Sequence, residues 1–142
     1  MARKPLVIVF PAEPALVRAA LVAKGRVYRH LSGGARDTYW QLVTHADVET
    51  SEAYPAVGTM ATITGRGYGT ICAGLEELSA AGLITCMGRL RRAGKRGQPP
   101  LIWRVEQPPD TPEAEEKAIR AAIAQRDTRL TRGRPEFFRT GR

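Results

Sequence analysis

The chain has 142 residues, a length that corresponds to about one domain. It carries 22 Lys and Arg against 14 Asp and Glu, a formal net charge of +8, and 43% of its residues are hydrophobic, which excludes a wholly disordered chain. The apolar run from Leu6 to Phe10 is too short for a membrane span or a signal peptide, so we expect a cytoplasmic protein.

The two cysteines, Cys72 and Cys86, are too few for a disulfide-stapled secreted scaffold. Together with His30 and His45 they form no zinc-binding spacing. We therefore expect two ordinary buried or half-buried thiols, with no metal site and no cofactor.

The positive charge is concentrated in particular stretches of the chain, of which residues 89–96 are the densest. Residues 45–84 carry one basic and five acidic side chains, whereas residues 85–105 carry six basic side chains and no acidic one. Most of the basic residues are Arg, whose planar guanidinium suits phosphates and guanine edges. This favours a surface that meets a polyanion, although basic surfaces also bind acidic proteins and anionic lipids.

The first third of the chain predicts one strand and two helices. Leu6 to Phe10 predicts a short strand that could pair at an edge or exchange between subunits. Residues 15–24 have apolar side chains at helical spacing and end at Gly25, while residues 27–31 are ambiguous. Ser32 is expected to cap a helix that runs to about Ala46. Its apolar stripe is Ala35, Tyr39, Leu42, Val43 and Ala46.

Two helices separated by a glycine turn are expected next. Residues 47–55 are polar and predict a loop, residues 57–64 predict a short helix, and Gly65 ends it. A second helix is expected from about Gly67 to Ala81, with Gly82 as its terminator. Its core positions are Ile71, Leu75 and Leu78, and Gly74 permits another backbone to approach closely.

The last third predicts a hairpin and a helix. Residues 83–90 and 101–105 read as paired strands joined by a long basic tip rich in glycine and proline. Thr111 is expected to cap a final helix, and the arginine-rich end from Arg126 to Arg142 is expected to be mobile. The apolar seam of that helix is Ile119, Ile123, Arg126 and Leu130.

Several stretches carry a family resemblance. They are Gly34 to Leu42 followed by Ala46-Asp47, Tyr54-Pro55, Thr59 to Ala61, the turn glycine Gly65, Thr70-Ile71, and Leu75 to Ile84. Together they resemble the winged helix-turn-helix domain of bacterial, plasmid and phage regulators and replication proteins, over roughly residues 32–105.

The resemblance implies an α+β fold with a three-helix core and a β-hairpin wing. It divides the chain into an N-terminal strand and helix extension (1–31), the winged domain (32–107), and a C-terminal helix with a basic tail (108–142). It implies a double-stranded DNA-binding protein, a transcription regulator or a plasmid or phage replication or maintenance factor, associated with the nucleoid.

In this interpretation the second helix of the pair enters the major groove, and the wing arginines contact the backbone or the minor groove. The implied DNA-binding residues are Arg66, Gly67, Tyr68, Gly69, Thr70, Cys72, Ala73, Arg89, Arg91, Arg92, Lys95 and Arg96. A homodimer is expected, through residues 6–10 or 112–130, because one small module buries little DNA surface.

The chain departs from the family where its relatives place polar or basic side chains. At the start of the second helix only Tyr68 and Thr70 offer ordinary hydrogen bonds, so we expect sparse base readout and an affinity carried mainly by arginines. A protein-interaction module that kept the fold and lost its DNA readout is the alternative.

Two other functions are weaker. Residues 65–70 are glycine-rich but lack the spacing and the lysine of a phosphate-binding loop. The chain has no Gly-x-Ser-x-Gly, His-Glu-x-x-His or Cys-x-x-Cys motif, so we expect no enzyme.

Overall fold

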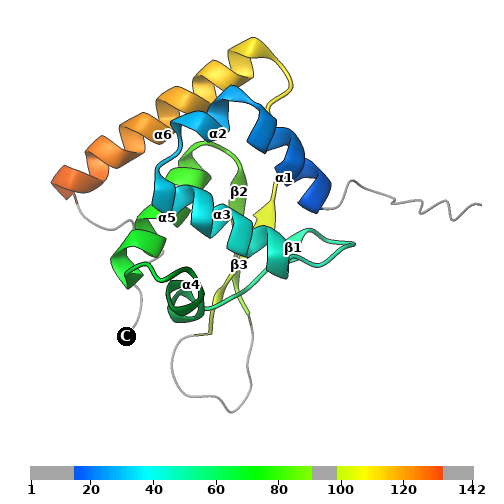
Figure 1. Ribbon diagram of the computed structural model, residues 1–142, viewed down its shortest axis with the longest axis vertical. Coiled ribbons are helices and arrows are strands. Elements are labelled where there is room, and N and C mark those ends of the chain that lie inside the picture. The colour runs from blue at the N-terminus through cyan, green and yellow to red at the C-terminus, as the bar shows by residue number, and fades with distance from the viewer. Residues whose placement is uncertain (1–14, 91–98, 133–142) are drawn as a thin grey trace, which may run out of the picture.

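The structure is a computed structural model that describes residues 15–90 and 99–132, with side chains up to residue 129. The described residues form six helices and one three-stranded antiparallel sheet (Figure 1). In chain order these are α1 (Ala15–Lys24), α2 (Arg26–His30), α3 (Gly33–His45), β1 (Glu52–Ala53), α4 (Val57–Thr64), α5 (Tyr68–Ala80), β2 (Ile84–Arg89), β3 (Leu101–Val105) and α6 (Pro112–Arg132). None of these helices is both long and apolar enough to cross a membrane.

Side-chain caps mark where the helices α3 and α6 begin. The Ser32 hydroxyl accepts a hydrogen bond from the Ala35 amide at 3.1 Å, which confirms it as the N-cap of α3. The Thr111 hydroxyl accepts from the Ala114 amide at 3.1 Å and caps α6 in the same way. The ambiguous residues 27–31 fall largely within the short helix α2.

The turn between α4 and α5 depends on Gly65. Gly65 has a φ of 73°, in the left-handed region that glycine adopts without steric cost, so the expected role of this residue is confirmed. At the other end of α5 the Leu83 amide donates to the Leu78 carbonyl at 3.0 Å, and Gly82 donates to Ser79 at 3.1 Å. This pair of bonds closes the helix and directs the chain into β2.

The sheet has the strand order β1-β3-β2. The β2–β3 hairpin pairs Ile84 with Val105 and Arg89 with Leu101, with an irregularity between Cys86 and Gly88. The prediction of a loop over residues 47–55 was wrong at Glu52–Ala53, which pairs with β3 as a short edge strand. A two-residue strand is formed by this long-range pairing, so its own sequence gives little signal.

The hydrophobic core lies between α3, α5 and the sheet. Tyr39, Leu42, Ile71, Leu75 and Leu78 are fully buried in it, as the helical spacing predicts. The same core also contains buried side chains of α1, α2 and α6, so these three helices share one core with α3 and α5. Figure 1 shows α6 crossing above α2 and α5, on the side opposite the hairpin.

Gly74 is a point of close approach between α3 and α5. A Cβ at this position would lie 2.8 Å from the Thr38 hydroxyl oxygen and 3.0 Å from the Gly34 carbonyl oxygen. The expectation that Gly74 admits a neighbouring backbone is therefore confirmed.

The seam predicted for the last helix was partly wrong. Ile119 is 4% exposed, but Ile123 is 39% exposed, and the buried positions beside Ile119 are Ala118 and Ala122. The predicted strand at residues 6–10 and the tip of the hairpin at 91–98 lie outside the described residues. The arrangement of helices around a small antiparallel sheet is compatible with a winged helix.

Candidate nucleic-acid interface

The exposed side of the helix pair α4 and α5 forms a surface with few side chains. This α4–α5 surface consists of Gly58, Thr59, Thr62, Ile63, Gly65, Arg66, Gly67, Tyr68 and Gly69, all of them exposed. A Cβ added at Gly58, Gly65 or Gly69 would meet no atom within 4 Å, so the backbone itself is open to a partner. Only one charged residue, Arg66, occurs between positions 53 and 75. This surface therefore contributes no carboxylate of its own, and the Asp37 carboxylate of α3 lies beside it, paired with Arg66.

The first turn of α5 is the most accessible part of that helix. Tyr68 is 52% exposed, Gly69 and Thr70 are exposed, and Ala73 is half-buried. The prediction that Cys72 also faces outward was wrong, because Cys72 is fully buried. It lies on the flank between the core face and the outer face, where a small sulfur-bearing side chain is readily buried. Cys86 is half-buried, so both thiols lie where the composition suggested.

The second half of the outer face of α5 is covered by α6. Gly69, Ala73, Glu76 and Ala80 share one helix face, since they are three or four residues apart. Glu76 and Glu77 are each 2% exposed, and they pair with Arg129 and Arg126 of α6. Any partner of α5 must therefore approach its N-terminal turns.

Arg66 joins the glycine turn to the start of α3. Its Nε donates to the Asp37 carboxylate at 2.7 Å, and both side chains are about two-fifths exposed. The methyl carbon of Thr70 lies 2.6 Å from where a Cβ of Gly34 would be, so Thr70 packs directly against the first turn of α3.

A groove runs along this contact. It has a volume of about 940 Å³ and lies between the first turns of α3 and α5 and the last part of α6. The polar and charged side chains on its wall are Ser32, Arg66, Thr70, Glu77, Arg126 and Arg129.

Polar contacts tie the two strands of the hairpin together near both of their ends. Arg89 donates from Nη1 to the Pro99 carbonyl at 2.8 Å and is half-buried, so it ties the two strands together. At the end of the strands away from the tip, Glu106 accepts bonds from the Thr85 hydroxyl and from Arg104, whose Nη2 lies 2.8 Å away. Burial opposes ionisation of Glu106, but these bonds outweigh it and hold its pKa below the ordinary value. The remaining predicted wing residues, Arg91, Arg92, Lys95 and Arg96, lie outside the described residues.

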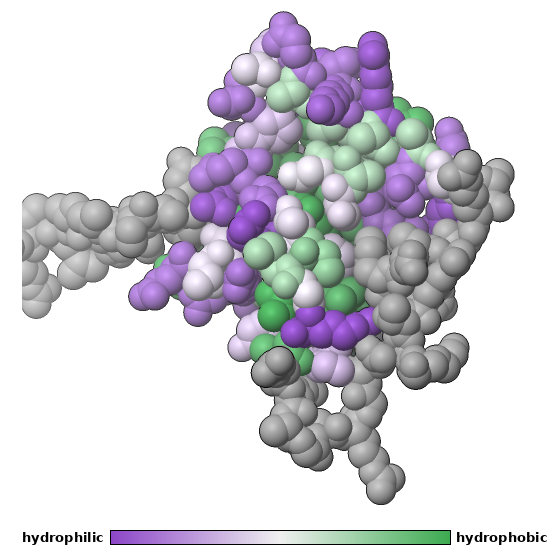
Figure 2. All heavy atoms as spheres, turned by 180° about the vertical axis from the view of Figure 1, so that it is seen from behind, coloured by the Kyte–Doolittle hydropathy of each residue, from purple (hydrophilic) through white to green (hydrophobic). Residues whose placement is uncertain are grey.

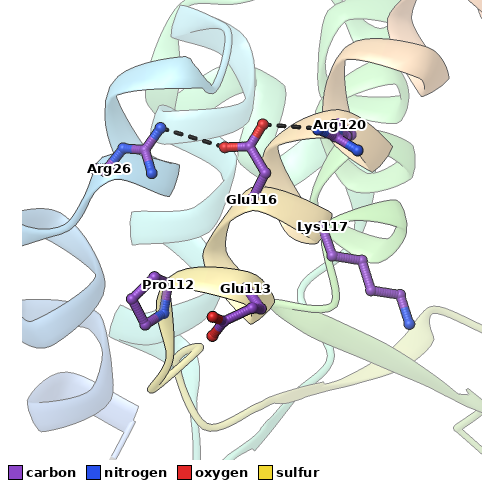
Figure 3. Close-up of a pocket in the computed structure, with 6 residues that line it drawn as sticks. All are labelled: Arg26, Pro112, Glu113, Glu116, Lys117 and Arg120. Atoms are coloured by element: carbon purple, nitrogen blue, oxygen red, sulfur yellow. Dashed lines mark hydrogen bonds and ion pairs between the residues drawn. The ribbon is translucent and has the colours of Figure 1, made fainter.

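A second hollow, of about 510 Å³, lies between α2 and α6 (Figure 3). In it Glu116 points between Arg26 and Arg120 and pairs with both, at 3.3 and 3.2 Å. These ion pairs are solvent-exposed and contribute little stability each. Their side chains are 42–79% exposed, so we assign this hollow to the solvated surface. Hydrophilic residues also gather at the top of the molecule when it is seen from behind (Figure 2).

Sequence reasoning missed the contribution of α3 and α6 to the surroundings of α5. The glycines Gly33 and Gly34 received no role, and Arg126 was placed in an apolar seam, whereas it pairs with Glu77. The only signal for this was the acidic pair Glu76-Glu77 within an otherwise uncharged helix, which requires nearby cations if it is buried.

Comparison with protein-family models, with curated proteins and with solved structures found no match to this chain.

Proposed function

We propose that this chain is a winged-helix protein that binds double-stranded DNA, with the N-terminal turns of α5 in the major groove. The observation that carries the proposal is the α4–α5 surface beside the open first turn of α5, which is exposed, rich in glycine and contains no acidic residue of its own. The order of α3, β1, α4, α5, β2 and β3, with β3 central in the sheet, supports the same fold assignment.

The covering of α5 by α6 defines how DNA is approached. Recognition helices of this kind contact base edges with their N-terminal residues, and these are the residues that α6 leaves open. Tyr68 and Thr70 are the side chains there that can reach a base, so direct readout is restricted to a few base pairs. The absence of Cβ atoms at Gly67 and Gly69 lets the helix backbone lie close to the duplex.

The affinity comes mainly from phosphate contacts of arginines on the hairpin, between residues 89 and 96. Such contacts hold the module in register on the duplex and add no base specificity by themselves. The biological role we propose is transcription regulation or the replication or maintenance of a plasmid or phage, carried out by a homodimer in the cytoplasm, on the nucleoid.

Selection of bound sequences from a random duplex library tests this proposal. We expect enrichment of a short motif, present twice with centres about one helical turn apart if the dimer is correct. Binding should weaken steeply as salt rises, because released counterions drive association. Recovery of unenriched sequences, with weak binding that disappears at moderate salt, would contradict specific DNA binding.

The second candidate function is a protein-interaction module, favoured by one observation. Ile63 is 56% exposed and Tyr68 is 52% exposed on the same surface, while Glu76 is withdrawn under α6. Exposed apolar side chains of this size are typical of protein contacts. Enrichment of a DNA motif in the selection experiment would decide against this candidate.

A further inference from the structure

We propose that the groove between α3, α5 and α6 is a phosphate-binding site, centred on the first turn of α3. The site adjoins the α4–α5 surface and shares Arg66, Gly67 and Gly69 with it, and the proposal assigns a role to Gly33, which the sequence left without one. The phosphate belongs either to the duplex backbone, a case that rests on the proposed function, or to a free phosphorylated ligand.

The backbone amides of two helices open into this groove. In α3 the Ala35 amide is taken by the Ser32 hydroxyl and the Ser32 amide by Glu77 at 2.8 Å, while the amides of Gly33 and Gly34 have no acceptor among residues 15–90 and 99–132. In α5 the N-cap is Gly67, which has no side chain to accept a bond from the first-turn amides. First-turn amides and the positive end of the helix dipole are favourable partners for an anion.

Three guanidinium groups line the same groove as these amides. The Nη2 of Arg66 lies 3.1 Å from where a Cβ of Gly33 would be, which places it directly beside the first turn of α3. Arg126 and Arg129 of α6 also line the groove, together with the Glu77 carboxylate. Guanidinium and phosphate form charge-assisted hydrogen bonds that are stronger than those between neutral groups.

Each of these arginines already has a carboxylate partner, but its hydrogen bond to that partner does not use all of the guanidinium N–H donors. Arg66 uses Nε for Asp37, while Arg126 and Arg129 each use Nη1, for Glu77 and Glu76. Since a guanidinium carries five N–H donors, every one of the three keeps donors for a ligand. The carboxylates also hold the arginines in place, and the exposed pair with Asp37 is weak enough to be exchanged for a phosphate.

The small residues of the groove give the phosphate room. Gly33, Gly34, Gly67 and Gly69 line it together with Ser32 and Thr70, whose hydroxyls are further hydrogen-bonding groups. A volume of about 940 Å³ exceeds what one phosphate needs, and it admits the neighbouring sugars of a backbone or the rest of a small ligand.

The test compares Gly33→Glu with Gly33→Gln in the full chain. The glutamate would place a carboxylate beside Arg66 and at a helix N-terminus, where it favours the fold, so its thermal midpoint should equal or exceed that of the glutamine variant. It occupies the position of the proposed phosphate, whereas glutamine has the same size without the charge. We expect phosphate binding to fall by about tenfold or more in Gly33→Glu and to remain within about threefold in Gly33→Gln.

Binding is followed by the amide resonances of Gly33, Gly34, Gly69 and Thr70. Inorganic phosphate is titrated against chloride of equal ionic strength, and a duplex of about two helical turns is titrated separately. We expect both probes to shift these resonances in the wild type. Shifts with phosphate and none with the duplex would assign the groove to a free phosphorylated ligand and would count against the proposed DNA function.

Two results would overturn the proposal that the groove binds phosphate. One is duplex binding that shifts α5 and leaves Gly33 and Gly34 unmoved, which would keep the DNA function. The other is equal binding by Gly33→Glu and Gly33→Gln. If neither inorganic phosphate nor the duplex binds the wild type, the phosphate site and the DNA-binding function are both wrong.

Discussion

The buried carboxylate of Glu76, in the middle of α5, is paired with the guanidinium of Arg129, which lies 53 residues further along the chain in α6. The neighbouring Glu77 pairs with Arg126 and also accepts the amide of Ser32. These contacts fix α6 against α5 and the start of α3 together. They also determine which part of α5 remains open to a partner.

We expect Arg129→Ala to lower the free energy of unfolding by about 2–3 kcal/mol, because it leaves the Glu76 carboxylate buried without its cation. The cost is below that of a fully buried pair, since Arg129 is itself 21% exposed. Chemical denaturation measures the change. Arg120→Ala, which breaks an exposed pair in the same helix, is the matched control and should cost less than about 1 kcal/mol. The assignment is wrong if the two variants are equally stable.

Gly74→Ala is expected to destabilise the protein by about 1–3 kcal/mol, because the added methyl group would overlap atoms of Thr38 and Gly34. Gly69→Ala, in the same helix, is the control. Its methyl group would meet no atom within 4 Å, so the gain in helix propensity should raise stability by up to about 1 kcal/mol. Thermal unfolding of both variants checks the opposite signs. A stabilising Gly74→Ala would show that α3 and α5 are further apart than described.

Features that depend on nearby residues could be predicted from the sequence. The cap at Ser32, the turn at Gly65 and the end of α5 at Gly82 were all anticipated, because each relies on the chemistry of one residue and its immediate backbone. The hairpin strands were anticipated to within one or two residues for the same reason.

Features that depend on distant residues were not predicted. Strand β1 is held by its pairing with β3, about fifty residues away, and two residues give no periodic pattern. Periodicity places Glu76 on the polar side of α5, but it does not say whether water or another helix covers that side. The burial of Cys72 was missed for the same reason. Helical periodicity shows which residues share a face, but it does not show what packs against that face.

The stability of the hairpin base should depend on pH through Glu106. Hydrogen bonds from Arg104 and Thr85 hold its pKa below the ordinary value of 4.5, so the ionised form stabilises the fold. That contribution is complete above about pH 4.5 and is lost as the pH falls through the folded-state pKa. Glu106→Gln should therefore be less stable at pH 7, by less than about 1 kcal/mol, because the group keeps contact with solvent. Urea denaturation between pH 7 and pH 3 should show this difference shrink, and a constant difference would contradict it.

The replacement of Arg91, Arg92 and Arg96 by alanine tests the hairpin arginines. Each lost phosphate contact should lower the slope of log K against log salt by about 1, so the triple variant should show a slope shallower by up to about 3. Fluorescence anisotropy over a salt series measures it. A variant with Lys117→Ala and Arg120→Ala, which removes charges at the far hollow of Figure 3, should keep the wild-type slope. An unchanged slope in the triple variant would remove the wing from the interface.

Tyr68→Ala should reduce sequence selectivity more than total DNA affinity, because Tyr68 lies on the open turn of α5 while most of the proposed phosphate contacts are elsewhere. Competition between a selected site and a random duplex measures selectivity. We expect the difference in binding free energy between the two duplexes to shrink by about 1–3 kcal/mol, with little change in the salt slope. Tyr54→Ala is the matched control, since Tyr54 is 51% exposed against 52% for Tyr68 but lies outside the α4–α5 surface. Tyr68→Phe separates the hydroxyl from the ring, because a retained ratio would assign the contact to an apolar base edge such as a thymine methyl group. If Tyr68→Ala binds both duplexes as the wild type does, the open turn of α5 does not read DNA, and the interaction-module candidate becomes the better account of the exposed Tyr68 and Ile63.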